Sequence, residues 1–122
     1  MPKLNVLIRV INEETTLKYN TTAIITDEVI KYKSNDDTIE IFDYNNYKLV
    51  RENKELRMEY IFNEKETTKG IVFAKELNHT VDVNIKTKKI ERNNYDVDIE
   101  FSVEENNIKY QIEVIKWVYI KN

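Results

Sequence analysis

The sequence of 122 residues contains no cysteine, one glycine, one proline and one histidine. The absence of cysteine excludes disulfide bonds, thiolate metal ligands and a cysteine nucleophile. A single glycine cannot build the glycine-rich turn that cradles phosphate groups. These shortages leave few of the common types of active site open to this chain.

Long apolar runs and dense basic runs are also missing. No stretch approaches the roughly 18–20 apolar residues of a membrane span, and MPKLNVLIRVI at the start is too interrupted for a secretory signal. Basic and acidic residues number 19 and 22, so the net charge is −3 with both signs mixed. Nucleic acids and anionic membranes both attract concentrated positive charge. We therefore expect a cytoplasmic protein that binds neither nucleic acid nor membrane.

Period-two alternation extends over almost the whole chain. In YDVDIEFSVEENNIKYQIEV, residues 95–114, apolar side chains alternate with polar ones. Ile, Val, Thr, Tyr and Phe dominate such stretches, as expected for a half-buried pleated surface. Hydrophobic residues make up 41% of the chain, enough for a single domain over 1–122 to fold without a disulfide or a metal. The pattern predicts about ten short strands, and 64–78 is the only plausible helix.

Asn-Asn pairs predict the positions of the hairpin turns, because Asn tolerates positive φ better than most residues. We expect two-residue loops at 45–46 and 106–107 and a three-residue loop at 92–94. In each hairpin apolar residues then face apolar ones and opposite charges meet. The loops predict these cross-strand pairs: Glu40 with Arg51, Phe42 with Leu49, Phe101 with Ile112, Ile85 with Phe101, and Lys86 with Glu100.

Consecutive hairpins indicate an antiparallel up-and-down meander. Closing such a sheet into a barrel removes its two unpaired edges. The last segment, from 108 onwards, carries apolar residues on both faces, as expected of a bent strand that meets the first strand. We therefore predict an all-β barrel of about 8–10 strands, with a two-sheet sandwich as the alternative.

The strand order RMEYIF, GIVF, VDVNIKTKKI and YDVDIEFSVEENNIKYQIEV resembles the YwiB-like family, and TLKYNTTAIITDEVIKYK resembles its second and third strands. These are small uncharacterised bacterial proteins, and the resemblance implies a lipocalin-like, or calycin-like, β-barrel. It covers most of the chain through alternation and strand spacing. The family carries a Gly before the Leu that matches Leu77, where this chain has Lys75-Glu76. No activity is established for the family, so the resemblance implies a fold and no chemistry.

The polar residues form no complete catalytic set. His79 is predicted at the entry to a strand, where Asp82 projects to the opposite face, so we interpret it as a loop or edge histidine. Asp96, Asp98 and Glu100 share the polar face of a strand predicted to lie opposite lysines. A charge-paired outer face explains them better than an acid–base pair or a metal site. We expect no enzyme activity, no metal and no cofactor.

Aromatic residues are the remaining candidates for a site. Six are predicted to point into the barrel and to line a pocket or fill the interior: Tyr19, Tyr60, Phe62, Phe101, Tyr110 and Trp117. Barrels of about eight strands hold at most one small ligand, and many are filled by side chains. The leading hypothesis is a non-enzymatic barrel that binds a small apolar ligand at its mouth. The alternative is a structural or protein-interaction module with a solid core, including a homodimer.

Overall fold

Ten antiparallel strands make up the fold in the computed structural model, which describes residues 2–34 and 36–119. They follow one another as hairpins, and the last strand returns to pair with the first, so the sheet closes into a barrel. The predicted all-β fold and closed meander are confirmed. In chain order the strands are β1 (Lys3–Asn12), β2 (Thr16–Thr26), β3 (Val29–Lys33), β4 (Ile39–Asp43), β5 (Lys48–Glu52), β6 (Leu56–Ile61), β7 (Thr68–Ala74), β8 (His79–Asn93), β9 (Asp96–Val103) and β10 (Asn106–Tyr119).

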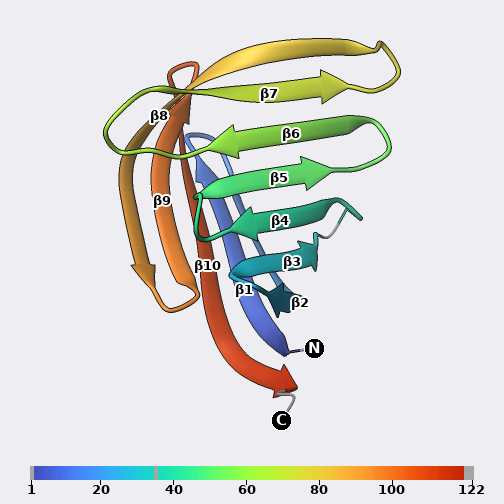
Figure 1. Ribbon diagram of the computed structural model, residues 1–122, viewed down its shortest axis with the longest axis vertical. Helices are drawn as coiled ribbons and strands as arrows, with labels where there is room; N and C mark the ends of the chain where they lie inside the picture. The colour runs from blue at the N-terminus through green and yellow to red at the C-terminus, as the bar shows by residue number, and fades with distance from the viewer. Residues whose placement is uncertain (1, 35, 120–122) are drawn as a thin grey trace.

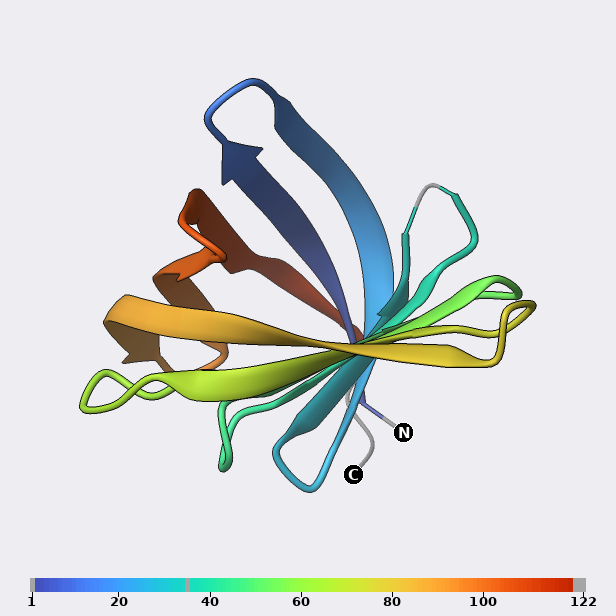
Figure 2. The ribbon, with the colours of Figure 1, turned by 90° about the horizontal axis from the view of Figure 1, so that it is seen from above.

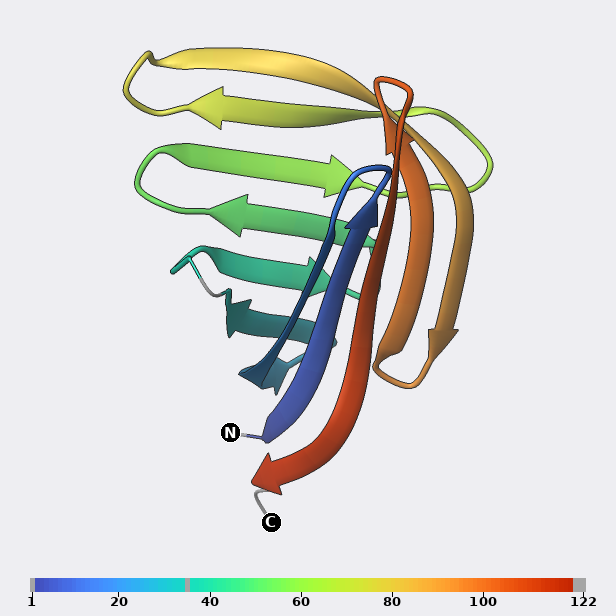
Figure 3. The same ribbon diagram turned by 180° about the vertical axis from the view of Figure 1, so that it is seen from behind.

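Two groups of strands cross each other to form the barrel. β3 to β7 lie across β1, β9 and β10 (Figures 1 and 3). β8 belongs to both groups, because it pairs with β7 from His79 to Ile85 and with β9 from Ile85 to Asn93. Seen from above, the hairpin ends of β3–β4, β5–β6 and β7–β8 project to one side beyond β2 (Figure 2). The long, bent β8 therefore joins the two groups.

Alternation along the strands places every second side chain in the interior. On β9, Val97, Ile99 and Phe101 are buried, whereas the residues between them are partly exposed. β10 contributes Tyr110 and Ile112 to the same interior in the same way. Burial of each apolar side chain of this size contributes about 1.5–3 kcal/mol to stability.

The single glycine, Gly70, lies within β7 where the interior is crowded. A Cβ atom at this position would come within 2.7 Å of Ile85 Cδ1 and 2.8 Å of Tyr60 Cδ1. The glycine therefore permits close packing against side chains of the neighbouring strands β6 and β8, and it does not form a turn. Among the described residues, every position with positive φ is a residue other than glycine.

The predicted register of the β4–β5 hairpin is confirmed. Glu40 lies opposite Arg51, and Phe42 lies opposite Leu49. The turn is supported by Asp43, whose carboxylate accepts hydrogen bonds from the backbone N–H groups that follow it. Here the Asn-rich loop indicated the turn correctly.

The predicted register of the β9–β10 hairpin is wrong. The two turn residues are Glu104 and Glu105, with φ of 47° and 74°, and Phe101 lies opposite Ile108 instead of Ile112. Glu104 is held there by Asn84: its Oε1 accepts a bond from Asn84 N–H at 2.6 Å, and its own N–H donates to Asn84 O at 3.1 Å. These contacts with β8 favour a turn that the Asn-Asn pair did not indicate.

The β8–β9 hairpin also differs from the prediction. Its turn is Asn94-Tyr95, and β8 bulges at Lys88. Because the loop is one residue shorter and the bulge shifts the register again, Phe101 faces Thr87 and not Ile85. Lys86 faces Ser102, so the predicted Lys86–Glu100 pair does not form.

Residues 64–78, the only plausible helix in the sequence, form no helix. Residues 68–74 form β7, which pairs with β6 on one side and with β8 on the other. Hydrogen bonding on both sides stabilises a strand in a segment that its Thr and Gly residues already disfavour as helix. None of the residues that the structure describes forms a helix able to cross a membrane.

Candidate functional site

A carboxylate is buried in the barrel interior. Glu40 is two residues before Phe42 on β4, and residues two apart on a strand point to the same face. Both side chains are buried, and Glu40 is only 2% exposed. A carboxylate at this depth is costly unless it is hydrogen-bonded and paired.

Three tyrosine hydroxyls form a hydrogen-bonded chain with Glu40. Tyr19 Oη donates to Glu40 Oε2 at 3.0 Å, and Tyr32 Oη donates to Glu40 Oε1 at 3.1 Å. Because the Tyr32 proton is used on Glu40, Tyr110 Oη donates to Tyr32 Oη at 2.5 Å. This hydrogen-bonded chain links β10 to β3 and β4, and β10 is a neighbour of neither of those strands in the sheet. It therefore spans the interior.

Arg51 is the counter-charge of this buried carboxylate. Its Nε lies 3.6 Å from Glu40 Oε1, which is an ion pair but too long for a hydrogen bond. Burial raises the pKa of Glu40, while the charge of Arg51 and the two tyrosine hydroxyls oppose this shift. Burial also raises the pKa of Tyr32 and of Tyr110. Both phenols therefore remain protonated hydrogen-bond donors.

Next to this cluster, inward-facing apolar side chains reach solvent. Leu56 lies two residues before the buried Met58 on β6 and faces the same way, yet it is 36% exposed. Met58 pairs with Val72, which pairs with Val81, and Val81 is 46% exposed. We call Leu56, Met58, Val72 and Val81 the apolar rim. Because Met58 also lies opposite Arg51, the rim adjoins the buried charges.

Strand pairing around the barrel is incomplete in two places. β2 pairs with β3 only over Ile24–Thr26, and β8 pairs with β9 only from Ile85 onwards. Among the described residues, the first part of β2 and the first part of β8 therefore have a strand partner on one side only. Val81 of the apolar rim lies on this part of β8, which pairs with β7 only.

The end of the barrel near Tyr44 is covered by side chains. The guanidinium carbon of Arg92 lies 4.7 Å from the centroid of the Tyr44 ring, and Arg92 Nη2 is 2.5 Å from Glu28 Oε2. Tyr95 Oη donates to Glu28 Oε1 at 3.0 Å, and Tyr44 Oη donates to the Tyr95 carbonyl at 2.7 Å. Hydrogen bonds from Arg92 and Tyr95 lower the pKa of Glu28. We call Glu28, Tyr44, Arg92 and Tyr95 the aromatic closure.

Five of the six predicted lining residues lie in the interior: Tyr19, Tyr60, Phe62, Phe101 and Tyr110. Phe101 packs against Phe62, with ring centroids 4.7 Å apart, and against Tyr60 at 6.2 Å. These rings contact one another across the barrel and fill space at this level. Their role in ligand binding stays a prediction.

Trp117, the sixth predicted lining residue, lies opposite the buried Leu4 of β1 and is 41% exposed. β9 pairs with β10 only as far as Ile112, so Trp117 has a strand neighbour only on the β1 side. Its ring packs edge-on against Tyr95, with centroids 6.1 Å apart. Trp117 thus lies at the margin of the aromatic closure.

Sequence reasoning missed Glu40, Tyr32 and Arg51 as members of an interior cluster. It paired Glu40 with Arg51 correctly but did not ask which face of the sheet the pair occupies. The necessary signal was present, because Glu40 shares its face with Phe42. An acidic residue in register with apolar ones on a half-buried strand indicates a buried carboxylate.

The polar candidates of the sequence lie on the outside. His79 is exposed at the first position of β8. Asp98 and Glu100 face Lys109 of β10, at 3.8 and 3.5 Å, and Asp96 accepts a hydrogen bond from a backbone N–H group of β10. Within residues 2–34 and 36–119, no three His, Asp or Glu side chains are arranged to hold a metal. The acidic row is thus a paired outer face, although Lys86 is not part of it.

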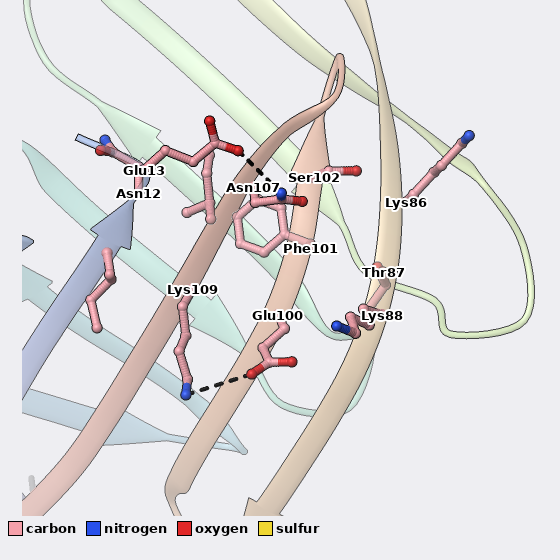
Figure 4. Close-up of a pocket in the computed structure, with 12 residues that line it drawn as sticks. Asn12, Glu13, Lys86, Thr87, Lys88, Glu100, Phe101, Ser102, Asn107 and Lys109 are labelled. Atoms are coloured by element: carbon pink, nitrogen blue, oxygen red, sulfur yellow. Dashed lines mark hydrogen bonds and ion pairs between the residues drawn. The ribbon is translucent and has the colours of Figure 1, made fainter. Parts of the chain in front are cut away.

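A recess of about 560 Å³ is lined by residues of β8, β9 and β10 and of the β1–β2 turn, and the buried Phe101 is among them (Figure 4). In its lining Lys109 pairs with Glu100 at 3.5 Å, and Asn107 Nδ2 donates to Glu13 at 3.1 Å. Lys86 and Lys88 border the same recess. Its lining is therefore of mixed charge and is partly neutralised within the chain.

Comparison with known proteins supports the fold. No family model matches the chain, and no curated protein matches it. The crystal structure of the YwiB protein from Bacillus subtilis is similar, with a TM-score of 0.57 and 10% sequence identity. The similarity covers 91% of this chain and 87% of the other. At this identity the likeness extends to the barrel fold alone.

Proposed function

We propose that the protein binds a small molecule with an apolar part, without turning it over, and that the apolar rim is the binding surface. The observation that carries this proposal is the exposure of inward-facing residues at one end of the barrel. Leu56 and Val81 leave 36% and 46% of their surfaces in solvent, although their neighbours Met58 and Val72 pack on the core. Apolar side chains beside a few polar groups are the usual composition of ligand sites.

The proposal can be tested by NMR titration with decan-1-ol as an uncharged apolar probe. We expect chemical-shift changes at residues of the apolar rim and little change in the aromatic closure. Val81→Gln should weaken binding about tenfold or more, because a polar side chain on the rim lowers the gain from burying the probe.

Ile71 offers a matched control for Val81. It is 41% exposed and lies on β7 between Gly70 and Val72, so it points to the opposite face. Ile71→Gln should therefore leave the affinity unchanged. Equal loss in both variants, or no shift of the rim with the probe, would contradict the proposal.

A structural or protein-interaction module is the second candidate. It is favoured by the packed level of the barrel around Gly70 and by exposed apolar residues near the end of β10: Ile115, Trp117 and Val118. Native mass spectrometry of protein purified from its own host separates the two. A retained small molecule supports binding, whereas bare protein at twice the chain mass supports a homodimer.

A further inference from the structure

The guanidinium group of Arg51 has unused hydrogen-bonding capacity. It points inward from β5 beside the apolar rim, and its side chain is 38% exposed. Its Nε is buried without a hydrogen-bond partner. An arginine carries five N–H donors in a planar fork, and none of the hydrogen bonds among the described residues uses those of Arg51. A buried donor left in this way costs free energy unless a partner arrives.

The other three arginines of the chain are all hydrogen-bonded to carboxylates. Arg9 donates to Glu113, Arg57 to Glu52 and Glu59, and Arg92 to Glu28. All of these contacts lie outside the interior cluster. The open fork is therefore a property of Arg51 and not of arginines in this protein generally.

Glu40 does not fill the fork of Arg51. The two tyrosine hydroxyls occupy one position on each of its oxygens, and the ion pair to Arg51 stays at 3.6 Å. The carboxylate is thus fixed in a position where it balances the charge of Arg51 without forming the two parallel bonds that the fork favours.

Tyr60 supplies a second unused donor on the same inner surface. It lies opposite Leu49 on β5, so it is a diagonal neighbour of Arg51, within reach of a long side chain. Its ring packs edge-on against Phe101, with centroids 6.2 Å apart. None of the hydrogen bonds among residues 2–34 and 36–119 uses the Tyr60 hydroxyl.

We propose that Arg51 and Tyr60 bind the carboxylate of an amphipathic acid whose apolar chain lies on the apolar rim. This inference rests on the proposed function and adds the chemistry of the head group. The fork of Arg51 matches the two oxygens of a carboxylate, and Tyr60 adds a third donor. Arg51 is already paired with Glu40, so a bound carboxylate leaves one net negative charge in the cluster. A dianionic phosphate would leave two and would meet stronger repulsion from Glu40.

The test compares decanoate with decan-1-ol, which has the same chain length and no charge, by isothermal titration at neutral pH. Wild-type protein should bind decanoate at least tenfold more tightly. Arg51→Gln should reduce this preference to about one, because it removes both the charge and the fork of donors. Tyr60→Phe should lower it severalfold. Arg57→Gln removes an arginine of the outer face and should not change it.

The outcomes separate the two proposals. Equal binding of acid and alcohol by wild-type protein would overturn the head-group inference and leave apolar binding intact. Binding of neither probe would overturn both. If Arg51→Gln does not fold, Arg51→Lys keeps the charge but loses the fork, and it should still reduce the preference for decanoate. An unchanged preference in Arg51→Lys, together with an unchanged one in Tyr60→Phe, would also contradict the inference.

Discussion

At one end of the barrel the aromatic closure covers the interior, whereas at the other the apolar rim is left in contact with solvent. Tyr44 is 1% exposed under Arg92, while Leu56 and Val81 are 36% and 46% exposed. The closed end uses one cation, one carboxylate and two rings, and the chain has the same residue types available elsewhere. The comparison shows that a few side chains are enough to cover one end of this barrel. The other end stays uncovered, as a ligand site that is entered from solvent would require.

The sharpest test of this contrast compares Phe101→Ala with Leu56→Ala. Phe101 is 5% exposed among packed rings, so its loss should cost about 3–5 kcal/mol. Leu56 is already partly exposed, so Leu56→Ala should lower the free energy of unfolding by less than about 1 kcal/mol. Chemical denaturation measures both. A small cost at Phe101 would mean that a cavity extends from the open end to that level.

Glu40→Gln tests the buried charge beside the rim. Because burial raises the pKa of Glu40 above its ordinary value of 4.5, the folded state holds the proton more tightly than the unfolded chain. The stability that Glu40 contributes is then fully present below that value and is lost as the pH rises through the raised pKa. The unfolding free energy of wild type relative to Glu40→Gln should therefore fall as the pH rises from below 4.5 through the raised pKa of Glu40. A pH-independent difference would contradict the burial of an ionisable group.

Arg92→Met should weaken the closed end and leave the open end unchanged. Losing the cation over the Tyr44 ring is expected to cost about 1 kcal/mol, with a larger effect on hydrogen exchange around Tyr44 than around Val81. Arg92→Lys should lose less, since it keeps the charge. Equal exchange changes at both ends would show that the two ends are not independent.

The smallest expected effect concerns the register of the outer face. Glu100 pairs with Lys109 at 3.5 Å, so Lys109→Glu and Glu100→Lys should show a coupling of about 0.2–1 kcal/mol in a double-mutant cycle. Lys86 faces Ser102, and the corresponding cycle of Lys86 with Glu100 should show none. Coupling between Lys86 and Glu100 would instead support the register predicted from a three-residue loop at 92–94.

Alternation and turn residues were enough to predict the closed meander and the β4–β5 register, because both depend on local pattern. The β9–β10 register was not predictable in this way. Its turn places Glu104 and Glu105 at positive φ, where Glu is uncommon, and contacts of Glu104 with Asn84 compensate. Such contacts join segments far apart in sequence. Local pattern therefore carries no information about them.

The candidate site was predictable in part for a similar reason. Strand parity places Tyr19, Tyr60 and Tyr110 inside, and the structure confirms this. The exposure of Trp117 depends on where β9 stops pairing with β10, which no alternation indicates. The same holds for the apolar rim, whose residues follow the inward pattern and remain uncovered because neighbouring strands end.

Pairing between the first and last strands sets the order in which this protein can be assembled on the ribosome. β1 bonds to β10 over its whole length, from Lys3 to Asn12. β1 is synthesised first and β10 last, so one edge of β1 has no native strand partner until the other nine strands have been made. Closure has to wait for this contact, and pairings between positions distant in the chain form slowly. Until then the unpaired edge of β1 can pair with strands of other chains. Crowding of nascent chains should therefore reduce the yield of folded protein more than instability of the finished barrel would.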